Sequence, residues 1–306
     1  MAMDEQKVVC LILLDLTAAF DTVNHQILLH RLEHRVGVTD KALQWFKSYL
    51  SDRNQHVRVR GHSSSSFPLG CGVPQGSVLG PVLFTLYTTP LGDVVRKHGV
   101  DFHLYADDTQ IYMTLDPGHI ATQEAAIRKL QRCVESISVW MTDNKLKLNQ
   151  DKSEVLMFGT PKQLSKMSLS CVEIGDSRVS VANQAKNLGV VMDGNLSMGP
   201  HVSSVCKSAH YHLRNLTQIR PYIDQITAER ITHAFVTSRL DCCNSLLFGI
   251  HKKHIAKLQK VQNSAAKLVT RKRKFDHVTP LLRELHWLPI SERIAFKILD
   301  CVVRVN

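Results

Sequence analysis

The sequence lacks an apolar run long enough to cross a membrane. The stretch VVCLILL at residues 8–14 is far shorter than the roughly 20 apolar residues that a membrane-spanning helix needs. Because Asp4 and Glu5 precede this run and Asp15 ends it, it is neither a signal peptide nor a membrane anchor. We therefore expect no membrane partner, and we interpret the run as a buried strand.

Paired cysteines and a standard nucleotide-binding loop are also missing. The eight cysteines include no C-x-x-C pair, and several lie among apolar residues, so we expect reduced thiols and an intracellular protein, in the nucleus or the cytoplasm. The glycine-rich GCGVPQG at 70–76 has neither the G-x-G-x-x-G spacing nor a Walker lysine, which excludes both common nucleotide cradles. The stretch HRLEH at 30–34 fits the pattern of inverted zinc metalloproteases, but no third ligand is identifiable.

Acidic residues are scarce in the last third of the chain. The whole sequence has 38 Lys and Arg against 27 Asp and Glu, which gives a net charge of +11. Residues 1–200 hold 20 basic and 20 acidic side chains, whereas residues 201–306 hold 18 basic and 7 acidic ones. This asymmetry suggests two functional regions, and the basic one favours a polyanionic partner such as nucleic acid or an acidic membrane surface.

The apolar periodicity predicts a mixed sheet-and-helix domain followed by a helical one. Two short strands flank the stretch ADD at 106–108, which predicts a tight hairpin with the two aspartates at its tip. An amphipathic helix is expected at about 120–142, and strands at about 145–148, 154–158 and 187–191. From about residue 203 onward the pattern is helical. We therefore predict an α+β fold.

Three carboxylates are the candidates for chemistry. Asp15 ends the first strand, where its side chain leaves the core at the edge of the sheet. If the hairpin of Asp107 and Asp108 lies beside that strand, the three carboxylates converge, and their mutual repulsion would require cations between them. Oxygen ligands suit Mg²⁺ or Mn²⁺, and two such ions form the clamp used in phosphoryl transfer. The alternative is that ADD merely supplies turn residues.

Five stretches that surround these carboxylates occur in a characteristic order. They are LLDLTAAFDTVNH (13–25), GVPQGSVLGPVLFTLY (72–87), YADDTQIY (105–112), LNQDKSEVLMFG (148–159) and NLGVVMD (187–193). In them the sequence resembles the reverse transcriptases of LINE-type, non-LTR retrotransposons. The segment LHWLPISERIAFKIL (285–299) resembles the region that follows the polymerase core in these elements. The resemblance implies a palm, a small antiparallel sheet with packed helices, at residues 1–195 and a basic helical thumb or connection region at 196–306.

The resemblance also implies roles for individual residues. Asp15, Asp107 and Asp108 would hold two Mg²⁺ or Mn²⁺ ions while a primer 3′-hydroxyl attacks the α-phosphate of a dNTP. Phe20 matches the aromatic residue that clashes with a ribonucleotide 2′-hydroxyl and so selects dNTP. Lys152 matches the lysine proposed to protonate the leaving pyrophosphate, although a solvated turn lysine is the alternative.

Two further segments match contacts with the nucleic-acid partners, an RNA template and a DNA primer. Gln75 and Gly76 match the loop that packs on the template and the nascent base pair. Leu188, Gly189 and Val190 fall where these enzymes grip the primer strand. The run RKRK at 271–274 is the densest basic point of the region expected to track phosphates, with a solvated face or a localisation signal as the alternatives.

The start of the sequence departs from the family pattern. Only about fourteen residues precede Asp15, so we expect the fingers region to be missing and the chain to be an N-terminally truncated fragment of a retroelement polyprotein. The predicted function is an RNA-directed DNA polymerase domain, with doubtful activity for the fragment alone. The alternative is a catalytically inactive remnant that still binds nucleic acid.

Overall fold

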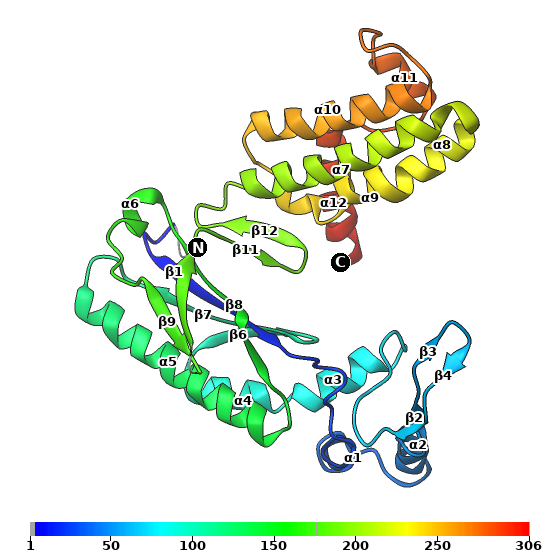
Figure 1. Ribbon diagram of the computed structural model, residues 1–306. Helices are drawn as coiled ribbons and strands as arrows, with labels where there is room; N and C mark the ends of the chain where they lie inside the picture. The colour runs from blue at the N-terminus through cyan, green and yellow to red at the C-terminus, as the bar shows by residue number, and fades with distance from the viewer. Residues whose placement is uncertain (1–3, 176, 306) are drawn as a thin grey trace. The chain divides into compact units, whose positions relative to one another are not determined.

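The computed structural model describes residues 4–175 and 177–305, and it divides into two compact units (Figure 1). The first unit extends to Asn183 and the second begins at Gln184. The division falls before the boundary that the sequence suggested at residue 195, because the β-hairpin of residues 184–193 packs on the first long helix of the second unit. None of the helices in the described residues is long and apolar enough to span a bilayer.

The first unit is built on a sheet of β1 (Val8–Leu16), β6 (Asp101–Tyr105), β7 (Asp108–Leu115), β8 (Leu148–Phe158), β9 (Cys171–Ile174) and β10 (Ser177–Ala182). Within the described residues the strand order is β6-β7-β1-β8-β10-β9. The sheet is mixed and not wholly antiparallel as expected, because β10 pairs in parallel with β8. Alternate residues of β1, from Val8 to Leu16, are buried on one face, as the apolar run predicted.

Helices α4 and α5 lie on one side of this sheet (Figure 1). The predicted helix at 120–142 is confirmed as α5, whose Leu130, Val134 and Ile137 join the same core as Ile12 and Ile111 of the sheet. The helices of the first unit are α1 (His25–His34), α2 (Asp40–Leu50), α3 (Gly80–Thr88), α4 (Leu91–Lys97), α5 (Ile120–Asp143) and α6 (Pro161–Leu164). Four two-residue strands, β2 (Asn54–Gln55), β3 (Arg58–Val59), β4 (His62–Ser63) and β5 (Phe67–Pro68), pair outside the sheet.

Two of the strand predictions are wrong in detail. The strand expected at 154–158 is confirmed as part of β8, whose pairing with β1 shifts in register between Leu13 and Asp15, whereas only Leu148 of the segment expected at 145–148 belongs to a strand. The strand expected at 187–191 is instead a hairpin of β11 (Gln184–Asn187) and β12 (Val190–Asp193). Leu188 and Gly189 form its turn, both with positive φ, which reverses the chain within two residues.

The second unit is helical apart from this hairpin. Its core joins apolar residues of its helices, including Val202 and Leu258, with Trp287 from the loop between the last two helices. The helices are α7 (Gly199–Ile219), α8 (Gln225–Thr232), α9 (Ser238–Asp241), α10 (Lys252–Val269), α11 (Thr279–Glu284) and α12 (Ile290–Val305), with short turns η1 (Arg220–Tyr222), η2 (His233–Thr237) and η3 (Asn244–Leu247). The helical character expected from residue 203 onward is confirmed.

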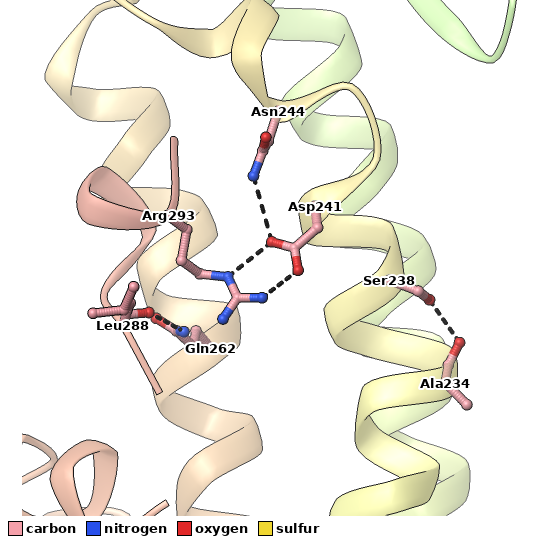
Figure 2. A network of polar contacts seen from close by, with 7 residues as sticks. All are labelled: Ala234, Ser238, Asp241, Asn244, Gln262, Leu288 and Arg293. Carbon is pink, nitrogen blue, oxygen red and sulfur yellow. Dashed lines mark hydrogen bonds and ion pairs between the residues drawn. The ribbon is translucent and has the colours of Figure 1, made fainter. Parts of the chain in front are cut away.

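A polar network ties α12 to α9 in the second unit (Figure 2). The guanidinium of Arg293 donates two hydrogen bonds to the carboxylate of Asp241, one of them from Nε at 2.8 Å. The Asn244 side chain donates to the same carboxylate at 3.4 Å. The Arg293 side chain is 21% exposed, so this bidentate pair is shielded from solvent more than an ordinary surface pair.

We expect Arg293→Gln to destabilise the second unit by about 1–2 kcal/mol, because Asp241 would keep its charge but lose both bonds from the guanidinium. Lys297→Gln, on the same helix, is the matched control, since the pair of Lys297 with Asp300 is half exposed and 3.6 Å long. Urea unfolding followed by circular dichroism measures both. Equal midpoints for the two variants would contradict this role.

Candidate functional site

The two aspartates of YADD lie at a tight hairpin between β6 and β7. Tyr105 pairs with Asp108, so Ala106 and Asp107 alone form the turn. Ala106 adopts a left-handed φ of 50°, which lets the chain reverse over two residues. The hairpin predicted from the sequence is therefore confirmed, with the carboxylates at its tip.

Antiparallel pairing of β1 with β7 brings Asp15 beside this tip. The register ends with Leu14 opposite Thr109, so Asp15 and Asp108 are the next residues along the two strands. Both belong to the less buried face of the sheet, since the core face of these strands carries Leu14 and Ile111. The structure thus joins carboxylates that are about ninety residues apart in sequence at one sheet edge.

Asp108 carries the electrostatic signature of this crowding. Partial burial, followed by the negative charges of Asp107 and Asp15, raises the pKa of the Asp108 carboxyl above its usual value. The folded protein therefore holds this proton more tightly than the unfolded chain does. The contribution of Asp108 to stability is present at low pH and is lost as the pH rises through the raised pKa.

Lys152 reaches Asp15 from the irregular part of β8. Its ammonium lies 3.9 Å from Asp15 Oδ2, and its side chain is 72% exposed. Ser153, in the same irregular stretch, accepts a hydrogen bond from the backbone N–H of Asp15 at 3.4 Å. Sequence reasoning did not single out Ser153, because the register shift that places it beside Asp15 is a property of strand pairing.

The oxygen atoms of these carboxylates are suitable ligands for a cation. In the part of the chain that the structure describes, no group of three or more carboxylate, histidine or cysteine side chains is arranged to surround one ion. Within the described residues, however, Asp15 Oδ2 is buried and accepts no hydrogen bond, and burial together with the acidic neighbours raises the pKa of Asp108. A carboxylate oxygen without a hydrogen-bond donor, next to other carboxylates, is a suitable ligand for a hard divalent cation.

A pocket of about 470 Å³ opens beside the carboxylate tip. Asp107 lines it together with Phe20, Gln75 and Gly76, three residues predicted from the sequence to contact substrate. The Phe20 ring packs on Phe84 of α3, with 4.9 Å between ring centroids, and this contact fixes one wall. The structure thus brings together four of the predicted site residues in one concave surface.

Hydrogen bonds hold the PQG loop against the segment that carries Phe20. The backbone N–H of Val73 donates to the Phe20 carbonyl at 2.9 Å, and the side-chain amide of Gln75 donates to Asp21 Oδ1 at 3.2 Å. Gly72 has a φ of 91°, and a Cβ there would lie 3.0 Å from the Asp21 carbonyl oxygen, so the close approach requires glycine. Asp21 was not predicted as a site residue, although it stands within the same motif as Asp15.

The residues predicted to grip the primer belong to the second unit. Leu188 and Gly189 form the turn between β11 and β12, and Val190 is the first residue of β12. Val190 is buried in the core of that unit, whereas Leu188 is 44% exposed. Their role with the primer stays a prediction.

The first unit thus places Asp15 and the hairpin of Asp107 and Asp108 at neighbouring positions of one sheet, beside a pocket of about 470 Å³. The family model for reverse transcriptase (RNA-dependent DNA polymerase) matches residues 1–192, more than half of the chain. The chain therefore belongs to the reverse transcriptase family.

Similar proteins agree with the resemblance to LINE-type elements. The chain is 28% identical to the probable RNA-directed DNA polymerase from transposon BS of Drosophila melanogaster, over 96% of this chain and 32% of that protein. It is 29% identical to the RNA-directed DNA polymerase from mobile element jockey of the same species, over 67% of this chain and 22% of that protein. The chain thus spans about a third or less of the length of these relatives.

Among solved structures, the chain is similar to apo telomerase from Candida tropicalis. The match has 13% sequence identity and a TM-score of 0.44, and it covers 95% of this chain and 51% of that one.

Removing one negative charge from the tip lowers the pKa of Asp108. We expect Asp107→Asn to bring the pKa of Asp108 closer to its usual value than Asp15→Asn does, because Asp107 makes the larger contribution to the shift. Carbon-detected NMR titration of the carboxyl groups measures the pKa of Asp108 in each variant. Asp143→Asn, at an exposed position at the end of α5, is the control. An Asp108 pKa that is unchanged in both tip variants would show that the carboxylates do not interact.

Proposed function

We propose that the first unit is the palm of an RNA-directed DNA polymerase, which transfers a nucleotide from a dNTP to a primer 3′-hydroxyl on an RNA template. The observation that carries this proposal is the pocket in which Asp107 lies together with Phe20, Gln75 and Gly76. It offers a sugar-facing aromatic ring and a glycine-containing loop directly beside a carboxylate. Family membership supports the same activity.

Asp15, Asp107 and Asp108 would hold two divalent ions, Mg²⁺ or Mn²⁺. Bound there, such ions lower the pKa of the attacking hydroxyl and stabilise the charge on the transferring phosphate. The chain itself supplies the oxygen ligands, and the hairpin and β1 hold them at one edge of a rigid sheet.

The other pocket residues orient the nucleotide. Phe20, held by Phe84, would stand beneath the sugar and exclude a 2′-hydroxyl. Gln75, held by Asp21, would pack with Gly76 against the template base and the nascent pair. Lys152, with its ammonium beside Asp15, would give a proton to the leaving pyrophosphate.

Primer extension tests this function directly. With an RNA template, a DNA primer, dNTPs and Mg²⁺, we expect the chain to add nucleotides and Asp107→Ala to add none, since the loss of a metal ligand removes the clamp. Asp143→Ala, which removes an exposed acid from α5 far along the sequence, should extend like the parent chain.

The opposite outcome defines the alternative function. If the parent chain fails to extend a primer but binds a primer-template duplex in a salt-sensitive manner, the chain is a nucleic-acid-binding remnant without polymerase activity. Equal extension by the parent chain and Asp107→Ala would show that the polymerase activity does not depend on the Asp107 carboxylate.

We propose that the second unit, the thumb-like region, binds the phosphate backbone through a groove between α7 and α10. The groove has a volume of about 770 Å³, and its charged lining residues are all basic: Arg214, Lys260, Lys267, Lys272 and Lys274. Such a surface attracts phosphates with little dependence on sequence.

The RKRK run at 271–274 has two different roles in this proposal. Lys272 and Lys274 line the groove, whereas Arg271 donates hydrogen bonds to the carbonyl oxygens of Arg220 and Ile223 and so holds the end of α10. Arg273 does neither. Of the RKRK run, only the two lysines that line the groove would therefore contact phosphates.

The salt dependence of binding separates these residues. In Lys260→Gln/Lys272→Gln/Lys274→Gln we expect the slope of log K against log salt for a duplex to fall by about 2–3, since each phosphate contact contributes about 0.9. The control triple Lys207→Gln/Lys252→Gln/Arg273→Gln removes the same charge from exposed sites outside the groove. Fluorescence anisotropy measures both, and equal slopes for the two triples would contradict the groove.

A further inference from the structure

A second pocket of the first unit adjoins the one proposed for the nucleotide. It has a volume of about 950 Å³ and shares two lining residues, Pro74 and Gln75, with the first pocket. From there it extends to Tyr49 at the end of α2 and to Arg53 and Asn54 after it. The two pockets therefore meet at the PQG loop.

Three side chains form a stack along α2 and into this second pocket. The Trp45 and Tyr49 rings are nearly parallel, with 5.4 Å between centroids and 12° between planes. The Arg53 guanidinium also lies over the Tyr49 ring, 4.6 Å from its centroid, and its Nε donates to the Tyr49 carbonyl at 2.7 Å. Trp45 is 53% exposed, while Tyr49 and Arg53 line the second pocket.

The segment that begins at Arg53 carries only positively charged side chains among its Asp, Glu, Lys and Arg positions. Residues 53–92 contain three arginines, Arg53, Arg58 and Arg60, and neither aspartate nor glutamate. Arg58 and Arg60 lie on the exposed β3–β4 hairpin. The acidic residues that line the second pocket are Asp21, which the Gln75 amide engages, and Asp52. Stacked planar groups next to exposed arginines are typical of surfaces that bind single-stranded nucleic acid.

We propose that this surface, the Trp45–Tyr49–Arg53 stack with its adjoining pocket, binds the unpaired strand of RNA that leads to the nucleotide pocket. The exposed Trp45 ring and the planar Arg53 guanidinium would stack on bases, while Arg58 and Arg60 would attract the phosphates. The shared Pro74 and Gln75 connect this strand to the position of the templating base. The assignment of the strand as template rests on the proposed polymerase function.

Binding to a short, unstructured RNA labelled with fluorescein tests the stack. We expect Trp45→Ala to weaken this binding about tenfold, because one stacked base contributes on this scale. Arg53→Lys keeps the charge but removes the planar group, so it should also weaken binding to the single strand. Tyr222→Ala removes an aromatic ring that is even more exposed, 87% against 53% for Trp45, from the second unit and should bind like the parent chain.

Tryptophan fluorescence supplies a readout that a purely structural role would not change. We expect RNA to quench emission in the parent chain and the quenching to be smaller in Trp45→Ala, since Trp45 is the most exposed of the three tryptophans. Unchanged affinity and unchanged quenching in Trp45→Ala would overturn the inference, as would an equal loss of affinity for a blunt duplex. A chain that binds RNA through Trp45 yet extends no primer would support the inference and contradict the polymerase function.

Discussion

The pairing of β1 with β7 is the constraint on which the site depends. Leu14 lies opposite Thr109, and this register alone places Asp15 beside Asp108 on the same face of the sheet. A shift by one residue would turn one of the two carboxylates toward the apolar core. The buried residues on the other face, such as Ile12 and Ile111, make such a shift costly, so the hydrophobic core fixes the geometry of the polar site.

Convergence of these carboxylates opposes the stability of the fold. Asp108 is partly buried next to two acidic neighbours, and Asp15 Oδ2 lacks a hydrogen-bond partner within the described residues. Lys152, at 3.9 Å and largely exposed, compensates only in part. Sites that are strained in this way are typically kept for function, because a bound cation both relieves the repulsion and supplies the chemistry.

The sequence predicted the parts of the site that depend on local pattern. The alternation around YADD was sufficient for the hairpin, and the apolar run before Asp15 for the strand. Features that depend on pairing between distant segments could not be predicted in the same way. The irregular stretch of β8 that presents Lys152 and Ser153, and the turn at Leu188, arise from registers that no local periodicity encodes. The separate role of Arg271 likewise depends on carbonyl oxygens some fifty residues away.

The proposed site requires Asp15, Asp107 and Asp108 to bind divalent cations together. Titration of the chain with Mn²⁺, followed by electron paramagnetic resonance, tests it without requiring catalysis. We expect the parent chain and Asp143→Asn to bind Mn²⁺ with equal affinity, and Asp15→Asn and Asp107→Asn each to weaken binding strongly, since each removes a hard oxygen ligand. Equal Mn²⁺ affinity in all four proteins would show that these carboxylates form no cation site.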